Sequence, residues 1–382
     1  MWSHTNYIII YGVLFNSLRM LVGAISAVYL ITVGFSFIEI AYLKTFQMLI
    51  VFLFDIPLSY ISDRNSRKIS IILSAIFSII WLLIMGLATQ KYQFYIAEFF
   101  NAISISLMSG AYISYLISNN NELSIQKLLG QYSQYQFIAM AISAFTGAIF
   151  IEIDSKSIWI ISALLITIQV FTLSWILPED IKYNQNKQNS FKKDIINIFF
   201  DIIKNTKLNK HIYTFIILGI FYQIIIQFWQ LLINDNTIID DGFYFGIIFT
   251  CILFAQSVSG HIAYKYTNNS NNIVICISIF ILFLSILFSM KYNIYIILPI
   301  ILVLMVIINK LLLIIITSEI HENIDDSLRT TYDSVISTLI KITLFFILPL
   351  FGFSYSFFGL YIVIFLFIFS IFSYYLIVKM KT

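Results

Sequence analysis

The sequence predicts an all-α polytopic membrane protein with twelve transmembrane helices in two six-helix bundles. Of its 382 residues, 60% are hydrophobic and only 11% are charged, whereas a soluble domain carries about 25% charged residues. The apolar residues fall in runs of about 20, the length of helix that crosses a hydrocarbon core of about 30 Å. The longest polar segment lies near the middle of the chain, and six apolar runs precede it and six follow it.

These runs are helices rather than strands. Only helices and closed barrels satisfy their backbone hydrogen bonds in lipid, and the runs are too long and continuous for barrel strands of about ten alternating residues. The first run lacks a small-residue cleavage site, so we expect a retained helix and not a signal peptide. We place the helices near 7–31, 38–61, 69–88, 94–117, 132–153, 158–177, 212–233, 243–264, 273–289, 294–317, 333–353 and 357–378.

The central polar segment divides the chain into three parts. We expect an N-terminal six-helix bundle at 1–177, a cytoplasmic linker at 178–211 and a C-terminal six-helix bundle at 212–382. The linker is basic and rich in Asn, Gln and Lys, and we expect an amphipathic surface helix around 191–204. A 6+6 arrangement suggests two repeated halves with a site between them near the bilayer midplane.

Lysine and arginine predict the orientation. With both termini cytoplasmic, the inner loops and the C-terminus hold fifteen of these residues and the outer loops hold three, which are Lys91, Lys156 and Lys291. This is a clear positive-inside bias. We therefore expect a multi-pass protein of a bacterial inner membrane.

The sequence argues against several other classes of protein. No loop is large enough for a separate catalytic domain, and there is no Gly-rich phosphate-binding loop. Cys251 and Cys276 lie in apolar runs and the four histidines are scattered, so we expect no disulfide framework, metal or cofactor. A membrane enzyme or a non-transporting receptor stays open as an alternative, although an enzyme needs clustered acidic or histidine residues that the sequence does not show. We expect no nucleic-acid partner.

The most informative motif is Asp-Ile-Pro-Leu-Ser-Tyr-Ile-Ser-Asp-Arg-Asn-Ser-Arg-Lys at 55–68, between the second and third predicted helices. It resembles the signature G-x-L-a-D-r-x-G-r-k of the major facilitator superfamily. The charged positions match, while Ser59 and Ser66 replace the two glycines. Serine at position 59 still permits close helix packing, whereas Ser66 puts the tightness of the turn in doubt.

Three further segments extend the resemblance over most of the chain. Residues 260–265 are an eroded copy of 59–64 at an offset of 201 (260 − 59), with Tyr264 at the aspartate position. Residues 109–114 and 319–334 are similar to elements of bacterial drug-exporter branches of the superfamily. Generic small-residue packing and helix capping are the alternative explanation for these weaker matches.

The resemblance implies a cytoplasmic gate. Asp63 is expected to face the N-terminus of the helix at 333–353, whose unpaired N–H groups favour an anion, and to release it when the transporter opens inward. A solvated carboxylate paired with Arg64 is the alternative. The predicted gating residues are Asp63, Arg64, Arg67, Lys68 and Arg329.

Ionisable residues within the spans mark a pathway or a buried pair. Lys44 and Glu98 lie at similar depth and are candidates for a structural pair. Arg19 and Lys341 lie near mid-depth, which suggests a cavity suited to an anionic substrate, although Arg19 bound to helix carbonyls or to Glu98 is equally consistent. Lys310 is expected to snorkel toward the inner face.

A polar stripe on the helix at 212–233 completes the predicted cavity. Its glutamines recur at a spacing of three or four and therefore share a face, which either lines a cavity or makes interhelical hydrogen bonds. The predicted substrate-cavity residues are Arg19, Glu98, Asn101, Gln223, Gln227, Gln230 and Lys341.

The sequence thus favours a monomeric secondary transporter that exports a small organic molecule by alternating access, driven by protons. Glu98 is the first candidate proton carrier, since burial raises the affinity of a carboxylate for a proton, and Asp55 is the second. An anionic substrate such as a siderophore fits Arg19 and Lys341 better than a cationic drug. Uptake of an anionic nutrient or metal chelate stays open.

Overall fold

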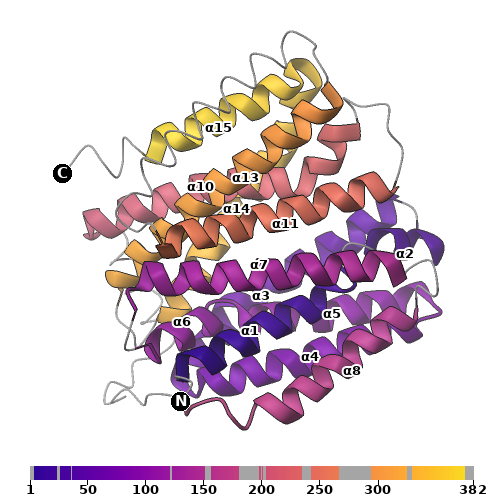
Figure 1. The fold of residues 1–382 in the computed structure, drawn as a ribbon, viewed down its shortest axis with the longest axis vertical. Coiled ribbons are helices and arrows are strands. Elements are labelled where there is room, and N and C mark those ends of the chain that lie inside the picture. The colour runs from indigo at the N-terminus through magenta and orange to yellow at the C-terminus, as the bar shows by residue number, and fades with distance from the viewer. Residues whose placement is uncertain are drawn as a thin grey trace. The chain divides into compact units, whose positions relative to one another are not determined.

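The computed structural model describes residues 4–23, 26–35, 37–120, 123–150, 156–179, 198, 200, 204–234, 242–265, 294–324 and 329–374. Every regular element in these residues is a helix (Figure 1). The helices are α1 (His4–Met20), α2 (Ser26–Thr32), α3 (Phe37–Arg64), α4 (Arg67–Leu87), α5 (Lys91–Met108), α6 (Ala111–Ser118), α7 (Ile125–Phe150), α8 (Ser157–Leu173), α10 (Thr206–Asn234), α11 (Gly242–Lys265), α13 (Ile294–Glu322), α14 (Arg329–Phe358) and α15 (Leu360–Tyr374).

These thirteen described helices account for eleven of the twelve predicted spans, because α1 with α2 and α5 with α6 each replace a single predicted helix. In the described residues, seven helical segments are long and apolar enough to cross a membrane. The predicted helix at 273–289 lies outside the described residues, and so does most of the predicted surface helix around 191–204.

The break between α5 and α6 is the more informative correction. Gly110 adopts a left-handed backbone with φ +67, which favours glycine. A Cβ on Gly110 would also lie 2.9 Å from the carbonyl oxygen of Thr330. The glycine therefore ends α5 and lets the start of α14 approach the backbone at this point.

The chain divides into two compact units. The first unit contains Met1–Glu122, Gln136–Ile195 and Ile324–Thr338, and the second contains Leu123–Tyr135, Ile196–Asn323 and Leu339–Thr382. Helix α7 therefore begins in the second unit and continues in the first, whereas α14 begins in the first and continues in the second. The boundaries at 177 and 211 predicted from the sequence remain a prediction.

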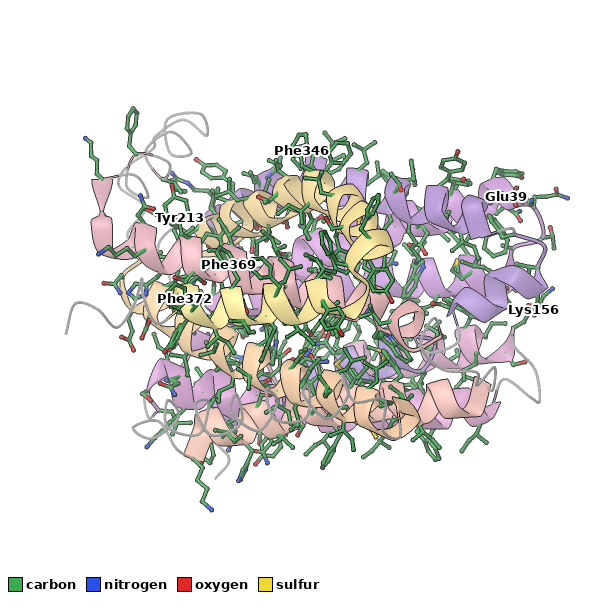
Figure 2. All side chains as sticks on the ribbon, turned by 90° about the horizontal axis from the view of Figure 1, so that it is seen from above. Glu39, Lys156, Tyr213, Phe346, Phe369 and Phe372 are labelled. Carbon is green, nitrogen blue, oxygen red and sulfur yellow. The ribbon has the colours of Figure 1, made fainter. Side chains whose placement is uncertain are left out.

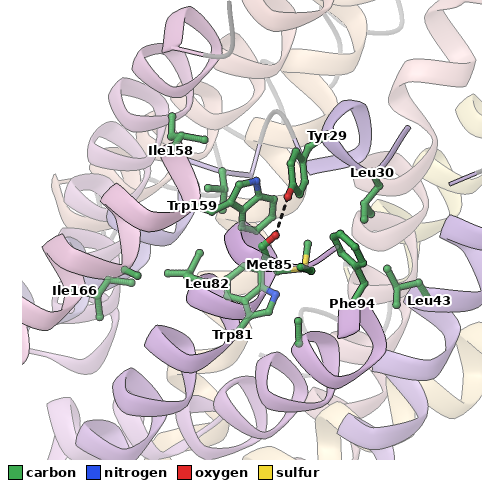
Figure 3. Packing of buried hydrophobic residues seen from close by; sticks show 14 of the residues in the cluster. Tyr29, Leu30, Leu43, Trp81, Leu82, Met85, Phe94, Ile158, Trp159 and Ile166 are labelled. Carbon is green, nitrogen blue, oxygen red and sulfur yellow. Dashed lines mark hydrogen bonds between the residues drawn. The ribbon is translucent and has the colours of Figure 1, made fainter. Parts of the chain in front are cut away.

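The core of the first unit is rich in aromatic residues (Figure 3). The ring of Trp159 on α8 lies 5.2 Å from that of Tyr29 on α2 and 5.7 Å from that of Trp81 on α4. The Tyr29 hydroxyl donates to the carbonyl of Met85 at 2.7 Å. Because hydrophobic burial does not drive helix association in lipid, this close packing and its hydrogen bond hold α2, α4 and α8 together.

The outer faces of the helices are apolar. Phe346 on α14 and Phe372 on α15 are 64% and 57% exposed, and Figure 2 shows them among many projecting side chains. An apolar surface of this extent marks a membrane-facing protein. Glu39 and Lys156 lie at the same end of the first unit (Figure 2).

Candidate functional site

The turn between α3 and α4 carries the charged motif. Arg64 is the last residue of α3 and Arg67 the first of α4. Ser66, which stands where the motif has a glycine, is the N-cap of α4, and its hydroxyl accepts from the Ile69 N–H at 3.1 Å. A capping serine therefore keeps the turn tight. This answers the doubt that the replacement of the motif's glycine by Ser66 raised about the turn.

Asp63 lies against the first turn of α14. Its carboxylate accepts from the Thr331 N–H and the Thr331 hydroxyl, both at 2.8 Å, and from the Thr330 N–H at 3.3 Å. The Arg67 guanidinium pairs with it at 2.9 Å. The contact implied by the resemblance is therefore present, and Arg67 supplies a cationic partner. The Arg64 guanidinium lies 5.2 Å from the Tyr60 ring centroid.

The contact continues along both helices as a buried polar seam. On α3, Asp55 and Ser59 precede Asp63 at intervals of four and so share its face. The Ser59 hydroxyl contacts the Ser334 hydroxyl, and the Ser337 hydroxyl donates to Asp55 at 2.6 Å. We call Asp55, Ser59, Asp63, Thr331, Ser334 and Ser337 the α3–α14 seam.

The other predicted gating residues support the seam from its edges. Arg67 also donates to the Ser118 hydroxyl at 2.7 Å, which ties the end of α6 to the turn. Lys68 pairs with Glu179 at 2.8 Å and donates to the Leu177 carbonyl at 2.8 Å, so it holds the segment after α8. Arg329 is buried at the start of α14.

The second unit contains a related close contact between α7 and α11. A Cβ on Gly260 of α11 would lie 2.4 Å from the Gln134 nitrogen of α7, and one on Gly130 would lie 2.6 Å from the Tyr264 nitrogen. Side chains add polar contacts such as His261 Nδ1 to Gln134 Oε1 at 3.2 Å. The eroded copy of the motif thus makes a close backbone crossing.

Arg19 belongs to a second polar cluster in the first unit. Its guanidinium donates to Asn101 at 2.6 Å, to Ser104 at 2.8 Å and to Ser78, and it lies 4.9 Å from the Trp81 ring centroid. Its direct partners are therefore neutral side chains. The sequence analysis considered helix carbonyls and Glu98 as partners, and neither interpretation included these side chains.

Glu98 connects this cluster to Lys44. The Asn101 amide donates to Glu98 at 2.8 Å, and Lys44 pairs with the other carboxylate oxygen of Glu98 at 2.8 Å. The predicted pairing of Lys44 with Glu98 is thus present. We call Arg19, Ser78, Ser104, Asn101, Glu98 and Lys44 the arginine network; it joins α1, α3, α4 and α5.

The structure describes the side chains of two of the four predicted cavity residues in the second unit. Gln223 on α10 and Lys341 on α14 are both partly exposed. The side chains of Gln227 and Gln230 lie outside the described part of the structure. Their role as cavity residues stays a prediction.

Sequence reasoning missed the serines of the arginine network. Ser70, Ser74 and Ser78 recur every fourth residue on α4 and are buried, and Ser74 also bonds the Ser104 hydroxyl at 3.1 Å. This serine stripe in an otherwise apolar helix was the available signal, because hydroxyls at helical spacing share a face.

Comparisons with known proteins agree with this geometry. The chain is a polytopic membrane transporter by its fold and by the motif at the end of α3. The model of the Major Facilitator Superfamily matches residues 7–346, so the chain belongs to that superfamily. It is therefore a secondary transporter of a small molecule and not an enzyme, and the predicted fold class is confirmed.

Among solved structures, a variant of the nucleoside transporter NupG has a TM-score of 0.64 to this chain. The two share 14% sequence identity, and the alignment covers 100% of each chain. At this identity the likeness concerns the fold alone. No curated protein sequence matches the chain.

Proposed function

We propose that this protein exports a small organic anion across a bacterial inner membrane, driven by protons, and that the α3–α14 seam is its cytoplasmic latch. The observation that carries the latch is the environment of Asp63, whose carboxylate accepts three hydrogen bonds from the first turn of α14. Charge-assisted bonds to a helix N-terminus are strong. The same groups can bind water once the helices separate, so the contact is reversible.

The charges of the spans support an anionic substrate. Arg19 and Lys341 both lie within helices, and Glu98 is already shared between Lys44 and Asn101. The arginine network therefore holds two cations and one carboxylate. An excess of positive charge favours a carboxylate-bearing molecule such as a siderophore, and uptake of an anionic nutrient or metal chelate is the second candidate.

Two carboxylates are candidates for the proton carrier. Glu98 lies in the arginine network, where its proton would compete with Lys44. Asp55 is fully buried within the seam and accepts from Ser337, so a proton there would act on the latch directly. This position favours Asp55 as the residue that couples proton binding to opening. Cytoplasmic termini and a monomeric state complete the proposal.

A reversible cross-link tests the latch. Ser59→Cys with Ser334→Cys, in a background of Cys251→Ser and Cys276→Ser, puts two thiols where two hydroxyls are in contact. Proteoliposomes are tested with the radiolabelled organic anions citrate and benzoate under a proton gradient. Oxidation is expected to stop transport and a reductant to restore it, because a disulfide keeps α14 on α3.

The single variants Ser59→Cys and Ser334→Cys are the matched controls and should be insensitive to oxidation. Undiminished transport with the cross-link formed would show that the seam does not open during the cycle.

A further inference from the structure

We propose that His211 and Glu319 form a pH-sensitive brace between α10 and α13 in the second unit. The brace is closed when the imidazole of His211 carries a proton and is weakened when that proton leaves. It lies where α10 begins and α13 ends. This inference goes beyond the proposed function, because it does not depend on which molecule is transported.

The middle parts of α10 and α13 are joined without the histidine. The Asn309 side-chain amide donates to the Leu218 carbonyl at 3.2 Å, and the Lys310 ammonium lies 5.6 Å from the centroid of the Tyr222 ring. These contacts keep the two helices side by side whatever the state of the brace. A change at the brace therefore acts on the ends of the two helices.

The geometry of the brace makes its strength depend on a proton. His211 Nδ1 lies 3.0 Å from Glu319 Oε2. The two atoms are buried, and neither has an aligned hydrogen bond within the described part of the chain. A neutral ring thus leaves buried polar atoms unsatisfied, which is costly. A protonated ring is attracted by the whole charge of the carboxylate, and this attraction needs no such alignment.

The end of α13 adds to the effect of the proton. Glu319 lies in the last turn of that helix, where the helix macrodipole disfavours a carboxylate and favours a cation. The Asn323 side-chain amide donates to the Glu319 carbonyl at 2.6 Å, so part of this helix end is already capped. A proton on His211 offsets both the Glu319 charge and the negative end of the helix dipole.

Protons reach the brace from one side. The His211 side chain is 9% exposed, whereas that of Glu319 is 33% exposed, so the carboxylate connects the pair to water. Histidine exchanges its proton between about pH 5 and pH 8. In the proposed orientation the start of α10 faces the cytoplasm, and an acidic cytoplasm then closes the brace.

Other ionisable groups lie on the helices around the brace. Helices α13 and α15 pack against α10, and α14 meets it where Ile340 lies beside Gly219. Because His321 is also buried and can titrate in the same range, the test compares variants of the pair at each pH. Within the second unit, the ionisable residues of these helices nearest this end in sequence are Lys207, Lys210 and Tyr213 on α10, His321 and Glu322 on α13, Lys341 on α14 and Tyr374 on α15.

Thermal unfolding of the intact protein in detergent, at about pH 6 and about pH 8.5, tests the brace. His211→Gln and Glu319→Gln are measured alone and together, because glutamine is neutral at both pH values. At the lower pH each single variant is expected to lower the melting temperature by about 2–4 °C. The double variant should lose no more than a single one, because both changes remove the same ion pair. At the higher pH all three losses should be smaller.

His261→Gln is the matched control, since His261 Nδ1 lies 3.2 Å from the neutral Gln134 Oε1. Its effect on the melting temperature should be the same at both pH values. Equal losses for His211→Gln at the two pH values, or additive losses in the double variant at the lower pH, would overturn the brace. These measurements need no substrate, so a failure of the proposed function leaves them unaffected.

Discussion

At the scale of single residues, the arginine network shows how a charge is kept inside an apolar bundle. Arg19 reaches three side chains on two helices through the fork of its guanidinium, and the nearest carboxylate is connected through Asn101. A guanidinium presents several donors in a fixed plane, which a compact ammonium cannot imitate. The network therefore depends on the type of cation as well as on its charge.

Arg19→Lys is expected to lower thermal stability. An ammonium cannot serve Asn101, Ser78 and Ser104 together, so we expect a loss of about 1–3 kcal/mol, the cost of buried groups left without a partner. Thermal unfolding in detergent measures it. Arg64→Lys, at a partly exposed site, is the control, and equal melting temperatures for both variants would contradict the prediction.

The Lys44–Glu98 pair is expected to be coupled in stability. A double-mutant cycle of Lys44→Met and Glu98→Gln should give a coupling energy of about 1–3 kcal/mol, since the Glu98 side chain is fully buried and pairs at 2.8 Å with Lys44, whose side chain is 41% exposed. The pair Lys91–Glu39, at 2.5 Å but with side chains 51% and 36% exposed, is the matched control. For this control pair we expect a coupling energy of at most about 1 kcal/mol. Equal coupling energies in both cycles would show that the burial of Glu98 does not strengthen its pairing with Lys44.

At the scale of elements, two pairs of helices meet by different means. Helices α3 and α14 meet through hydroxyls and carboxylates of the seam, whereas α7 and α11 meet through glycine backbones. Bonds of the first kind can be replaced by water when the helices part. A close glycine crossing depends on shape, and it tolerates no added side-chain atom without a shift of backbone.

Gly260→Ala is expected to destabilise the second unit by about 1–3 kcal/mol, the usual cost of overpacking. The new Cβ would lie 2.4 Å from a backbone nitrogen, which cannot move alone. Gly86→Ala is the control, because its nearest contact, at 3.0 Å, is a side-chain atom of Ile160. The melting temperatures of the two variants are measured in detergent. A smaller fall in melting temperature for Gly260→Ala than for Gly86→Ala would contradict the close backbone contact between α7 and α11.

At the scale of the whole molecule, α7 and α14 each contribute to both compact units. The seam lies in the part of α14 before residue 338, and the glycine crossing lies in the part of α7 before residue 135. Each unit therefore packs the beginning of a helix that continues in the other unit.

The predicted orientation is tested by labelling in whole cells. Lys156→Cys should react with a membrane-impermeant maleimide from outside, and Lys193→Cys should react only after the membrane is opened, because positive charge marks the cytoplasmic side. Both are placed in the background without native cysteines, and Cys251 is exposed in the structure. External labelling of Lys193→Cys would reverse the topology.

The sequence by itself determined the membrane class, the helical spans and the motif at 55–68. A membrane span needs an apolar run of sufficient length, and basic residues favour the cytoplasmic side, so both properties are visible in local sequence. It also indicated that Asp63 meets the start of α14 and that Lys44 meets Glu98. Only the tertiary structure decided that Arg67 pairs with Asp63, that serines and Asn101 hold Arg19, and that Lys310 lies beside Tyr222. These contacts join residues far apart in the chain, and their geometry depends on how the helices rotate and cross, which no local pattern encodes.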